Sequence, residues 1–306
     1  MIELWRGNAN AWECDELGHL NVRGYIAKAM QAAGRLAELI GMRGAFASHA
    51  TATLIARDIH VRYLAEVRPG APLAIEGGVE RVSGAGLEAL FLMRHAARGD
   101  LAATIRIAFD HADPASARPF PWPERLGGAA RGLIIPVPPE AAPRGVSSGI
   151  PTADISAEQA EALGLPRIGL GRFGPEDADA FGRIRPEVLI GKVSDSAVHA
   201  REAFPEQWAA HETGALTHAS ALLEARIAVR RLPRPGEGYE IRTGLIEAGP
   251  KVRRLVHWVL DPATGAALWS AEGVACIMDM KTRRLAPAEG DALAALRSAI
   301  RPGLSL

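Results

Sequence analysis

The segment from residue 15 to residue 25, DELGHLNVRGY, carries the residues best suited to chemistry. It places the carboxylate of Asp15 on a glycine-containing loop directly before a helical pattern. The first backbone N–H groups of a helix lack intrahelical acceptors and lie at the positive end of the helix dipole, so they stabilise an anionic oxygen. When a carbonyl carbon is attacked, its oxygen becomes such an anion. The segment therefore favours acyl-transfer chemistry, with Asp15 as a nucleophile or as a general base acting on water, and without a metal or a separate cofactor.

Each residue around Asp15 also has a structural interpretation. Asp15 could simply cap the helix and its loop, and Asn21 sits where a helix N-cap is expected. His19 could orient the loop by hydrogen bonds instead of touching a substrate. Tyr25 fits a core aromatic whose hydroxyl is satisfied. Cys14 neighbours the segment, but no sequence feature provides a base that would activate its thiol.

The elements that position this segment follow from hydrophobic periodicity. Apolar residues from Val22 to Ile40 fall on one stripe of a helix that Gly41 can end in the left-handed conformation. After it, β-patterned runs near 53–67, 71–82, 87–97 and 101–111 are separated by turn sequences suited to antiparallel hairpins. The stripe comprises Val22, Tyr25, Ile26, Ala29, Met30, Ala33, Leu36, Ala37 and Ile40.

The second half of the chain repeats this order. DELGHL at 15–20 returns as DAFGRI at 179–184, and Pro69-Gly70 returns as Pro235-Gly236. A helix is predicted from Pro186 to Arg201, with proline at a position that suits a first helical turn. Strands are predicted near 217–231, 237–248, 252–260 and 267–279. One helix preceding four strands, twice, indicates an internal duplication.

A connector rich in proline, glycine and alanine joins the halves. Its ten prolines between residues 113 and 170 make regular sheet improbable, and Ser156 with Gln159 predicts a short capped helix within it. A last short helix is predicted in DALAALRSAI, residues 291–300. The expected boundaries are an N-terminal domain at 1–113, a linker at 114–170, a C-terminal domain at 171–290 and a tail at 291–306.

One long helix followed by an antiparallel sheet must bury its apolar stripe against that sheet. The predicted class is therefore α+β, with two tandem domains whose sheets each wrap around a central helix. The two domains are expected to form a pseudo-dimer, and two chains could pair further into a homodimer of pseudo-dimers.

Composition restricts the classes of partner. The chain has 306 residues, 48% of them hydrophobic, and its 35 Lys and Arg balance its 35 Asp and Glu, so no overall field attracts nucleic acid or an anionic membrane. No apolar run is long enough for a membrane span or a signal peptide, which predicts a cytoplasmic protein. Cys14 and Cys276 form neither a disulfide framework nor a metal-ligand spacing.

The segment resembles the active-site motif of the 4-hydroxybenzoyl-CoA thioesterase branch of the hotdog superfamily, D-x-x-G-H-x-N-x-x-x-Y. The matching residues are Asp15, Gly18, His19, Asn21 and Tyr25. The resemblance implies a double-hotdog chain that hydrolyses an acyl-CoA thioester, with coenzyme A as part of the substrate. It also implies that Asp15 is catalytic and that the thioester carbonyl is bound by a backbone N–H which, by position, belongs to Val22.

The second copy departs from the motif. Arg183, Arg185 and Leu189 replace the histidine, asparagine and tyrosine, and Pro186 stands at the position of Val22. Proline has no N–H to donate. We therefore expect one competent site in each chain, despite the retained Asp179.

Two other functions fit parts of the sequence. A hotdog hydratase or dehydratase shares the fold, but its relatives usually carry Asp and His five positions apart, and Asp15 and His19 are four apart. A non-catalytic acyl-CoA binding protein is the other alternative. Candidate partners for coenzyme A phosphates are Arg57, Arg62, Arg81, Arg94, Lys251, Arg253 and Arg254.

Overall fold

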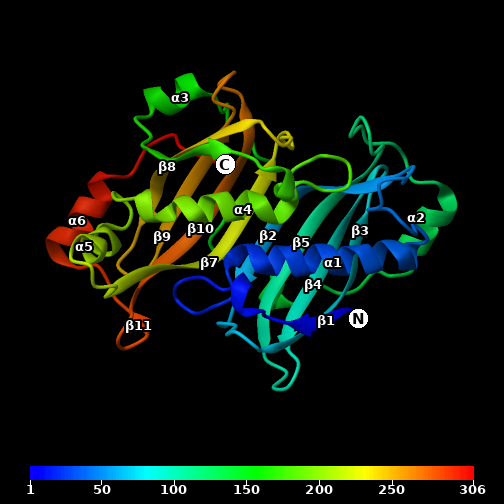
Figure 1. Cartoon of the computed structure of the whole chain (residues 1–306), viewed down its shortest axis with the longest axis horizontal. Coiled ribbons are helices and arrows are strands. Elements are labelled where there is room, and N and C mark those ends of the chain that lie inside the picture. Colours follow the sequence, from blue (N-terminus) through cyan, green and yellow to red (C-terminus); the bar gives the residue numbers. More distant parts are fainter. The chain divides into compact units, whose positions relative to one another are not determined.

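The computed structural model describes all residues from 1 to 306, and the chain separates into two compact units (Figure 1). The first unit comprises Met1–Ala142 together with Pro175–Gly191, and the second comprises Pro143–Gly174 together with Lys192–Leu306. No helix of the chain combines the length and the apolarity that a membrane span requires.

The first unit is an antiparallel sheet with one long helix. Its strands are hydrogen-bonded in the order β1-β3-β4-β5-β2. The helix α1 lies across these strands and contacts β1, β3, β4 and β5 (Figure 1). The elements are β1 (Ile2–Asn8), α1 (Val22–Ile40), β2 (Thr53–Tyr63), β3 (Pro72–Val82), β4 (Gly86–His95), β5 (Leu101–Ala112) and α2 (Glu124–Arg131).

The helix α1 has the bounds that its sequence predicts. Asn21 is its N-cap, and Gly41 ends it at φ +102°, where its N–H bonds to the carbonyls of Ala37 and Glu38. The predicted stripe is buried apart from Val22 and Met30, which are half-buried. Each large side chain of this stripe contributes about 1.5–3 kcal/mol when it leaves water. Burial of the stripe therefore fixes α1 on the sheet and, with it, the position of the loop before Val22.

The second unit repeats the antiparallel sheet. Its strands follow the order β7-β10-β9-β8-β6, and β11 pairs with β10. Its elements are α3 (Ala157–Ala162), β6 (Arg167–Arg172), α5 (Pro205–Glu212), β7 (His218–Val229), β8 (Gly238–Ala248), β9 (Arg253–Leu260), β10 (Ala267–Asp279), β11 (Arg284–Leu285) and α6 (Gly290–Ser298). The helix α4 (Pro186–Ser196) begins in the first unit and ends in the second.

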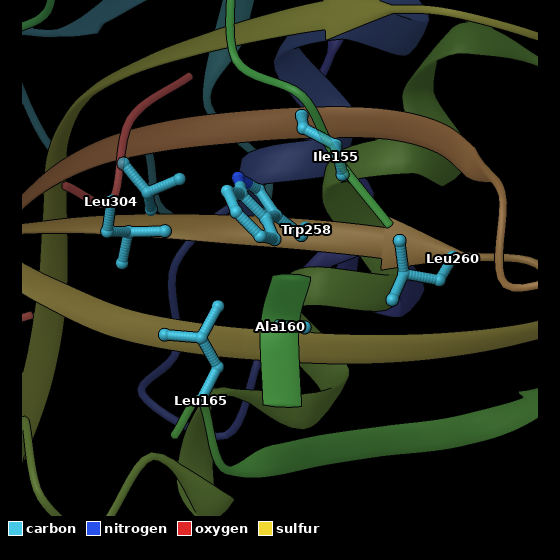
Figure 2. Close-up of a cluster of buried hydrophobic side chains, with 7 residues drawn as sticks. Ile155, Ala160, Leu165, Trp258, Leu260 and Leu304 are labelled. Carbon is cyan, nitrogen blue, oxygen red and sulfur yellow. The ribbon is translucent and has the colours of Figure 1, made fainter. Parts of the chain in front are cut away.

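The connector is ordered and covers sheet surfaces. In the second unit, Ile155, Ala160 and Leu165 bury Trp258 of β9 in an apolar cluster (Figure 2). In the first unit, Ala141 packs on apolar residues of β4. The predicted capped helix is confirmed as α3, with the Ser156 side chain accepting the N–H of Gln159.

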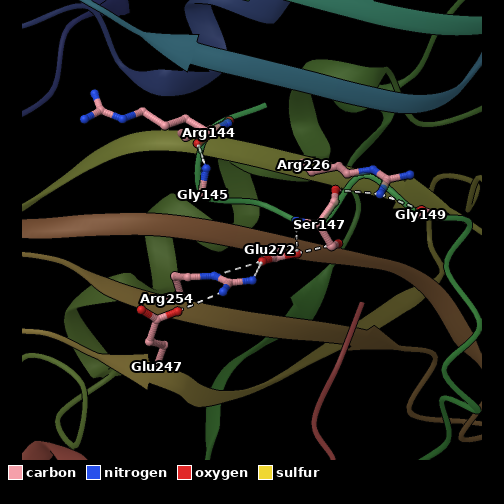
Figure 3. A network of polar contacts seen from close by, with 9 residues as sticks. Arg144, Gly145, Ser147, Gly149, Arg226, Glu247, Arg254 and Glu272 are labelled. Atoms are coloured by element: carbon pink, nitrogen blue, oxygen red, sulfur yellow. Dashed lines mark hydrogen bonds and ion pairs between the residues drawn. The ribbon is translucent and has the colours of Figure 1, made fainter. Parts of the chain in front are cut away.

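Buried charges also fasten the connector to the second sheet (Figure 3). Glu272 on β10 is buried and accepts both the N–H and the hydroxyl of Ser147, at 2.9 and 2.7 Å. Arg254 of β9 donates to the same carboxylate at 2.6 Å. Glu224 on β7 accepts the two backbone N–H groups of residues 144–145. Because buried carboxylates are costly unless they are bonded, these contacts define one path for the connector.

Several sequence predictions needed correction. Each sheet has a further edge strand before its helix, β1 and β6, so four strands per half was an undercount. The expectation of no regular sheet between 113 and 170 was wrong at its end, since β6 begins at Arg167. The helix predicted from Pro186 to Arg201 ends at Ser196 and continues as one 3-10 turn, Ala197–His199. The final helix is confirmed as α6.

Candidate active site

The loop that carries Asp15 is closed by backbone pairing at its two ends. A 3-10 turn, Ala11–Glu13, leads into it, and Cys14 forms an isolated antiparallel bridge with Leu20. The N–H of Asn21 donates to the carbonyl of Glu13 at 2.9 Å. These bonds return the chain to its starting point, so the carboxylate of Asp15 and the first turn of α1 lie on one small loop.

Asp15 is held by the loop through one carboxylate oxygen. Its Oδ1 accepts the N–H groups of Leu17 and His19, at 3.0 and 3.2 Å. Gly18 has φ +75°, which lets the chain turn back so that the carbonyl of His19 accepts the N–H of Asp15 at 2.8 Å. The second oxygen, Oδ2, has no hydrogen-bond partner within the chain, and Asp15 is half-buried. One oxygen thus fixes the carboxylate while the other stays available.

The start of α1 leaves the backbone N–H of Val22 without an acceptor. The Asn21 side chain accepts the N–H of Arg23 at 3.0 Å, and its carbonyl accepts the N–H of Gly24 at 2.8 Å. The structural interpretation of Asn21 as the N-cap is therefore confirmed. The N–H of Val22, the first helical residue, makes no hydrogen bond within the chain. It combines the positive end of the helix with a free donor, which is a binding site for an anionic oxygen.

His19 is oriented by an acidic residue that the motif does not contain. Its Nε2 lies 3.0 Å from Oε2 of Glu66, which follows β2. The N–H of Leu20 donates to the carbonyl of Val67 at 2.7 Å, which ties the same two segments together through the backbone. The ring of His19 is thereby held, while its backbone N–H bonds to Asp15.

Tyr25 lies one turn into α1 and belongs to the core. It is 4% exposed and makes an edge-to-face contact with Tyr63, with ring centroids 5.1 Å apart. Burial raises the pKa of Tyr25 well above its usual value, and the nearby Asp15 acts in the same direction. The hydroxyl of Tyr63 donates to the carbonyl of Val22 at 3.5 Å. The aromatic pair therefore contacts the first turn of α1 and helps to hold it in place.

A buried ion pair braces the entry to the loop. Nζ of Lys28 lies 2.7 and 2.8 Å from the two carboxylate oxygens of Glu13, and Lys28 is only 2% exposed. Burial acts to raise the pKa of Glu13, but the bonds from Lys28 and Asn10 outweigh it and lower that pKa. The Lys28 ammonium also lies 5.3 Å from the ring centre of Trp5. Sequence reasoning missed this pair, because a lysine within an apolar stripe carries no motif.

The thiol of Cys14 is poorly suited to nucleophilic chemistry. Burial raises its pKa, and the neighbouring carboxylates of Asp15 and Glu13 raise it further. Its Sγ donates to the carbonyl of Asn10 at 3.3 Å. A thiol that is partly buried beside two carboxylates stays protonated near neutral pH.

The second copy of the loop has the same backbone geometry. Asp179 Oδ1 accepts the N–H groups of Phe181 and Arg183, at 2.8 and 2.9 Å, and Gly182 has φ +69°. Its other oxygen differs from that of Asp15, because Nε of Arg183 lies 3.3 Å from Oδ2. Pro186 begins the following helix and offers no N–H. The second loop therefore lacks both the carboxylate oxygen without a partner and the free backbone N–H at the helix start.

The strand arginines considered for phosphate binding mostly have internal partners. Arg57 bonds to Asp110, Arg62 to the carbonyl of Glu140, Arg81 to Glu88, Arg94 to the carbonyl of Gly99, Arg253 to Glu206, and Arg254 to Glu247 and Glu272. Across the chain, no three His, Cys, Asp or Glu side chains cluster in a way suited to a metal ion.

Comparison with known proteins identifies the family. The model of the thioesterase-like superfamily matches residues 9–129 and 173–296, so both halves match it. No curated protein matches the sequence significantly.

Solved structures share the fold over nearly the whole chain. A putative oleoyl thioesterase from Lactobacillus plantarum aligns with a TM-score of 0.67 at 11% identity, covering 93% of this chain and 96% of that one. An acyl-ACP thioesterase from Bacteroides thetaiotaomicron aligns at 0.61 and 12% identity, covering 89% and 96%. The 12:0-ACP thioesterase from Umbellularia californica aligns at 0.61 and 11% identity, covering 89% and 92%. The predicted fold of two tandem hotdog domains is confirmed.

Proposed function

Because the chain belongs to the thioesterase-like superfamily, we propose that it hydrolyses an acyl-CoA thioester with Asp15 as its catalytic carboxylate. One observation carries the proposal. The free oxygen of Asp15 and the unbonded N–H of Val22 belong to the same closed loop. A nucleophile or base and an oxyanion donor are the two groups that thioester hydrolysis needs.

The reaction follows from these two groups. Oδ2 of Asp15 attacks the thioester carbon, or takes a proton from a water molecule that attacks it. The carbonyl oxygen becomes negative as the carbon turns tetrahedral, and the N–H of Val22 stabilises that charge. The C–S bond then breaks and the sulfur leaves as a thiolate, which takes its proton from Asp15 where Asp15 has acted as the base, or from solvent water where Asp15 has attacked directly. If Asp15 has formed an anhydride, water hydrolyses it to the free acid and restores the carboxylate.

The remaining motif residues support the reaction through position. Gly18 permits the turn, Asn21 caps the helix without using the N–H of Val22, and His19 donates its own N–H to the Asp15 carboxylate. Glu66 holds the ring of His19. These contacts fix the orientation of the attacking oxygen before a substrate arrives.

We propose that only the first loop is catalytic. In the second loop the guanidinium of Arg183 faces the carboxylate oxygen that would have to attack, and it is itself 6% exposed and stacked on Phe181, 4.8 Å from the ring centre. Pro186 removes the oxyanion donor. The second loop therefore keeps the shape of the site without its reactive groups.

The test is release of free thiol from a panel of acyl-CoA thioesters, followed with a thiol-reactive dye. The panel includes acyl groups on acyl carrier protein, because two of the structural relatives carry that substrate in their names. Wild type should turn over at least one thioester. Asp15→Asn keeps the size of the side chain and an oxygen that accepts the two loop N–H groups, but it removes the carboxylate. This variant should lose about 10²-fold or more of kcat.

Asp179→Asn is the matched control, since the two loops share their backbone geometry. It should retain kcat, and circular dichroism should show that both variants are folded. Equal activity of Asp15→Asn and wild type would refute the assignment of Asp15. Binding of acyl-CoA without cleavage of any thioester would favour a non-catalytic binder, and addition of water to an enoyl-CoA would favour the hydratase.

A further inference from the structure

A surface pocket of about 480 Å³ lies beside the candidate active site in the first unit. It is formed by the loop between β2 and β3 and by the turn between β4 and β5. Its lining residues are Glu66, Arg68, Pro69, Gly70, Ala71, His95 and Arg98. The two arginines and the histidine on this concave surface are side chains of the type that binds phosphate in proteins.

The two arginines of this pocket have N–H groups that make no hydrogen bond within the chain. The side chain of Arg68 is exposed and makes no hydrogen bond or ion pair within the chain, although its backbone carbonyl accepts the N–H of Ala71. Arg98 bonds to Asp100 through Nε alone, at 2.5 Å, and its side chain is 55% exposed. Its two terminal nitrogens are therefore available. His95 also lines the pocket, and its Nδ1 is buried and has no hydrogen-bond partner within the chain.

The pocket shares a wall with the site that contains Asp15. Glu66 lines the pocket and also lies 3.0 Å from the ring of His19. The N–H of His19 in turn bonds to the Asp15 carboxylate. A thioester whose carbonyl lies at Val22 could therefore extend its thiol-bearing arm past His19 toward the two arginines.

We infer that this pocket binds a phosphate on the carrier arm of the thioester substrate, with Arg68 and Arg98 as its charged contacts. The inference rests on the proposed function, because it takes the substrate to be a pantetheine thioester. Coenzyme A and acyl carrier protein both join pantetheine through a phosphate, so the chemistry recognised is common to the two carriers. Bidentate guanidinium contacts suit phosphate oxygens in geometry as well as in charge.

The experiment compares the same acyl group on coenzyme A and on N-acetylcysteamine, which keeps the thioester but has no phosphate. In the double variant Arg68→Ala/Arg98→Ala, KM for the acyl-CoA should rise about 10-fold or more while kcat stays near that of wild type. The N-acetylcysteamine thioester should be hydrolysed with unchanged kcat and KM. Arg35→Ala is the matched control, because Arg35 is an exposed arginine of α1 that pairs with Glu38 and does not line the pocket, so all values should be unchanged.

The outcomes separate this inference from the proposed function. An unchanged KM for acyl-CoA, or an equal loss with both substrates, overturns the phosphate pocket and leaves the hydrolase proposal standing. If neither substrate is cleaved, calorimetric titration with coenzyme A and with pantetheine decides the matter. Weaker binding of coenzyme A alone by the double variant supports the pocket, and equal binding by variant and wild type refutes it. A rise in KM for acyl carrier protein thioesters as well assigns the phosphate that both carriers place on pantetheine, and a rise for acyl-CoA alone assigns the other phosphates of coenzyme A.

Discussion

Substituting Val22 with proline removes one backbone N–H and little else. Val22 is the first residue of α1, a position that proline favours because its N–H has no intrahelical acceptor. The preceding residue, Asn21, already has ψ 145°, in the extended region that a following proline requires. The second copy of the loop carries Pro186 at the same place, before a complete helix. The fold therefore tolerates the change that the proposed chemistry does not.

The expected magnitude follows from the bonds that Val22 makes. Its N–H has no acceptor within the chain, so the substitution breaks no hydrogen bond of the folded state. Its carbonyl, which accepts the Tyr63 hydroxyl, is unchanged. We expect the free energy of unfolding to change by less than about 1 kcal/mol. Loss of one oxyanion donor costs about 3 kcal/mol in other enzymes, which is about 10²-fold in kcat.

The assay is thiol release under saturating substrate, with Val22→Ala as the control. Alanine shortens the side chain but keeps the N–H, so any packing effect appears in both variants and the oxyanion effect appears only with proline. Unfolding in urea, measured for both, should give similar midpoints. If Val22→Pro and Val22→Ala have the same kcat while both are folded, the N–H of Val22 is not the oxyanion donor.

Two further predictions concern other groups. Cys14→Ser should retain most of the wild-type kcat in the thiol-release assay, because the raised pKa of Cys14 keeps its thiol protonated; loss of about 10²-fold would instead indicate a catalytic thiol. Burial lowers the pKa of His257 to about 4 from an unfolded value of 6.5, so the unfolded state binds the proton first and stability falls as the pH drops from 6.5 toward 4. Between pH 7.5 and pH 5, urea unfolding of wild type should lose about 2 kcal/mol more than that of His257→Gln, and equal losses would contradict the burial of a neutral imidazole.

Local signals were sufficient to predict α1 and the loop before it. The apolar stripe, the cap at Asn21 and the glycine at 41 all indicate the same helix, and the structure has those bounds. The hydrogen bonds of Asp15 reach no farther than His19. Because these contacts span only a few residues, a motif can record them.

The edge strands were missed for a physical reason. β1 pairs only with β3, and β6 pairs only with β8. Most residues of β1 are exposed, so its sequence lacks the alternation that marks a half-buried strand. Its pairing is determined by the free edge of β3, which the sequence of β1 does not reveal.

The parts of the site that sequence reasoning missed depend on contacts between residues that are far apart in the sequence. Glu66 lies far from His19 in sequence, and they meet because Leu20 pairs with Val67. The arginines of the pocket lie in loops, where no hydrophobic periodicity indicates their position. The arginines on strands mostly bond to nearby carboxylates or carbonyls. Guanidinium groups that keep unbonded nitrogens in a concave loop region are thus the better candidates for a ligand.

The two loops separate what shapes the site from what makes it reactive. Both hold the aspartate by two N–H groups and both turn at a glycine with positive φ, so these features belong to the fold. The loops differ where a substrate would be attacked and where its oxyanion would be held. An arginine opposite Asp179 and a proline at the helix start satisfy or remove the two groups that Asp15 and Val22 leave open. Because the two loops share their geometry and differ in these two groups, the comparison is the physical argument for a single catalytic loop in each chain.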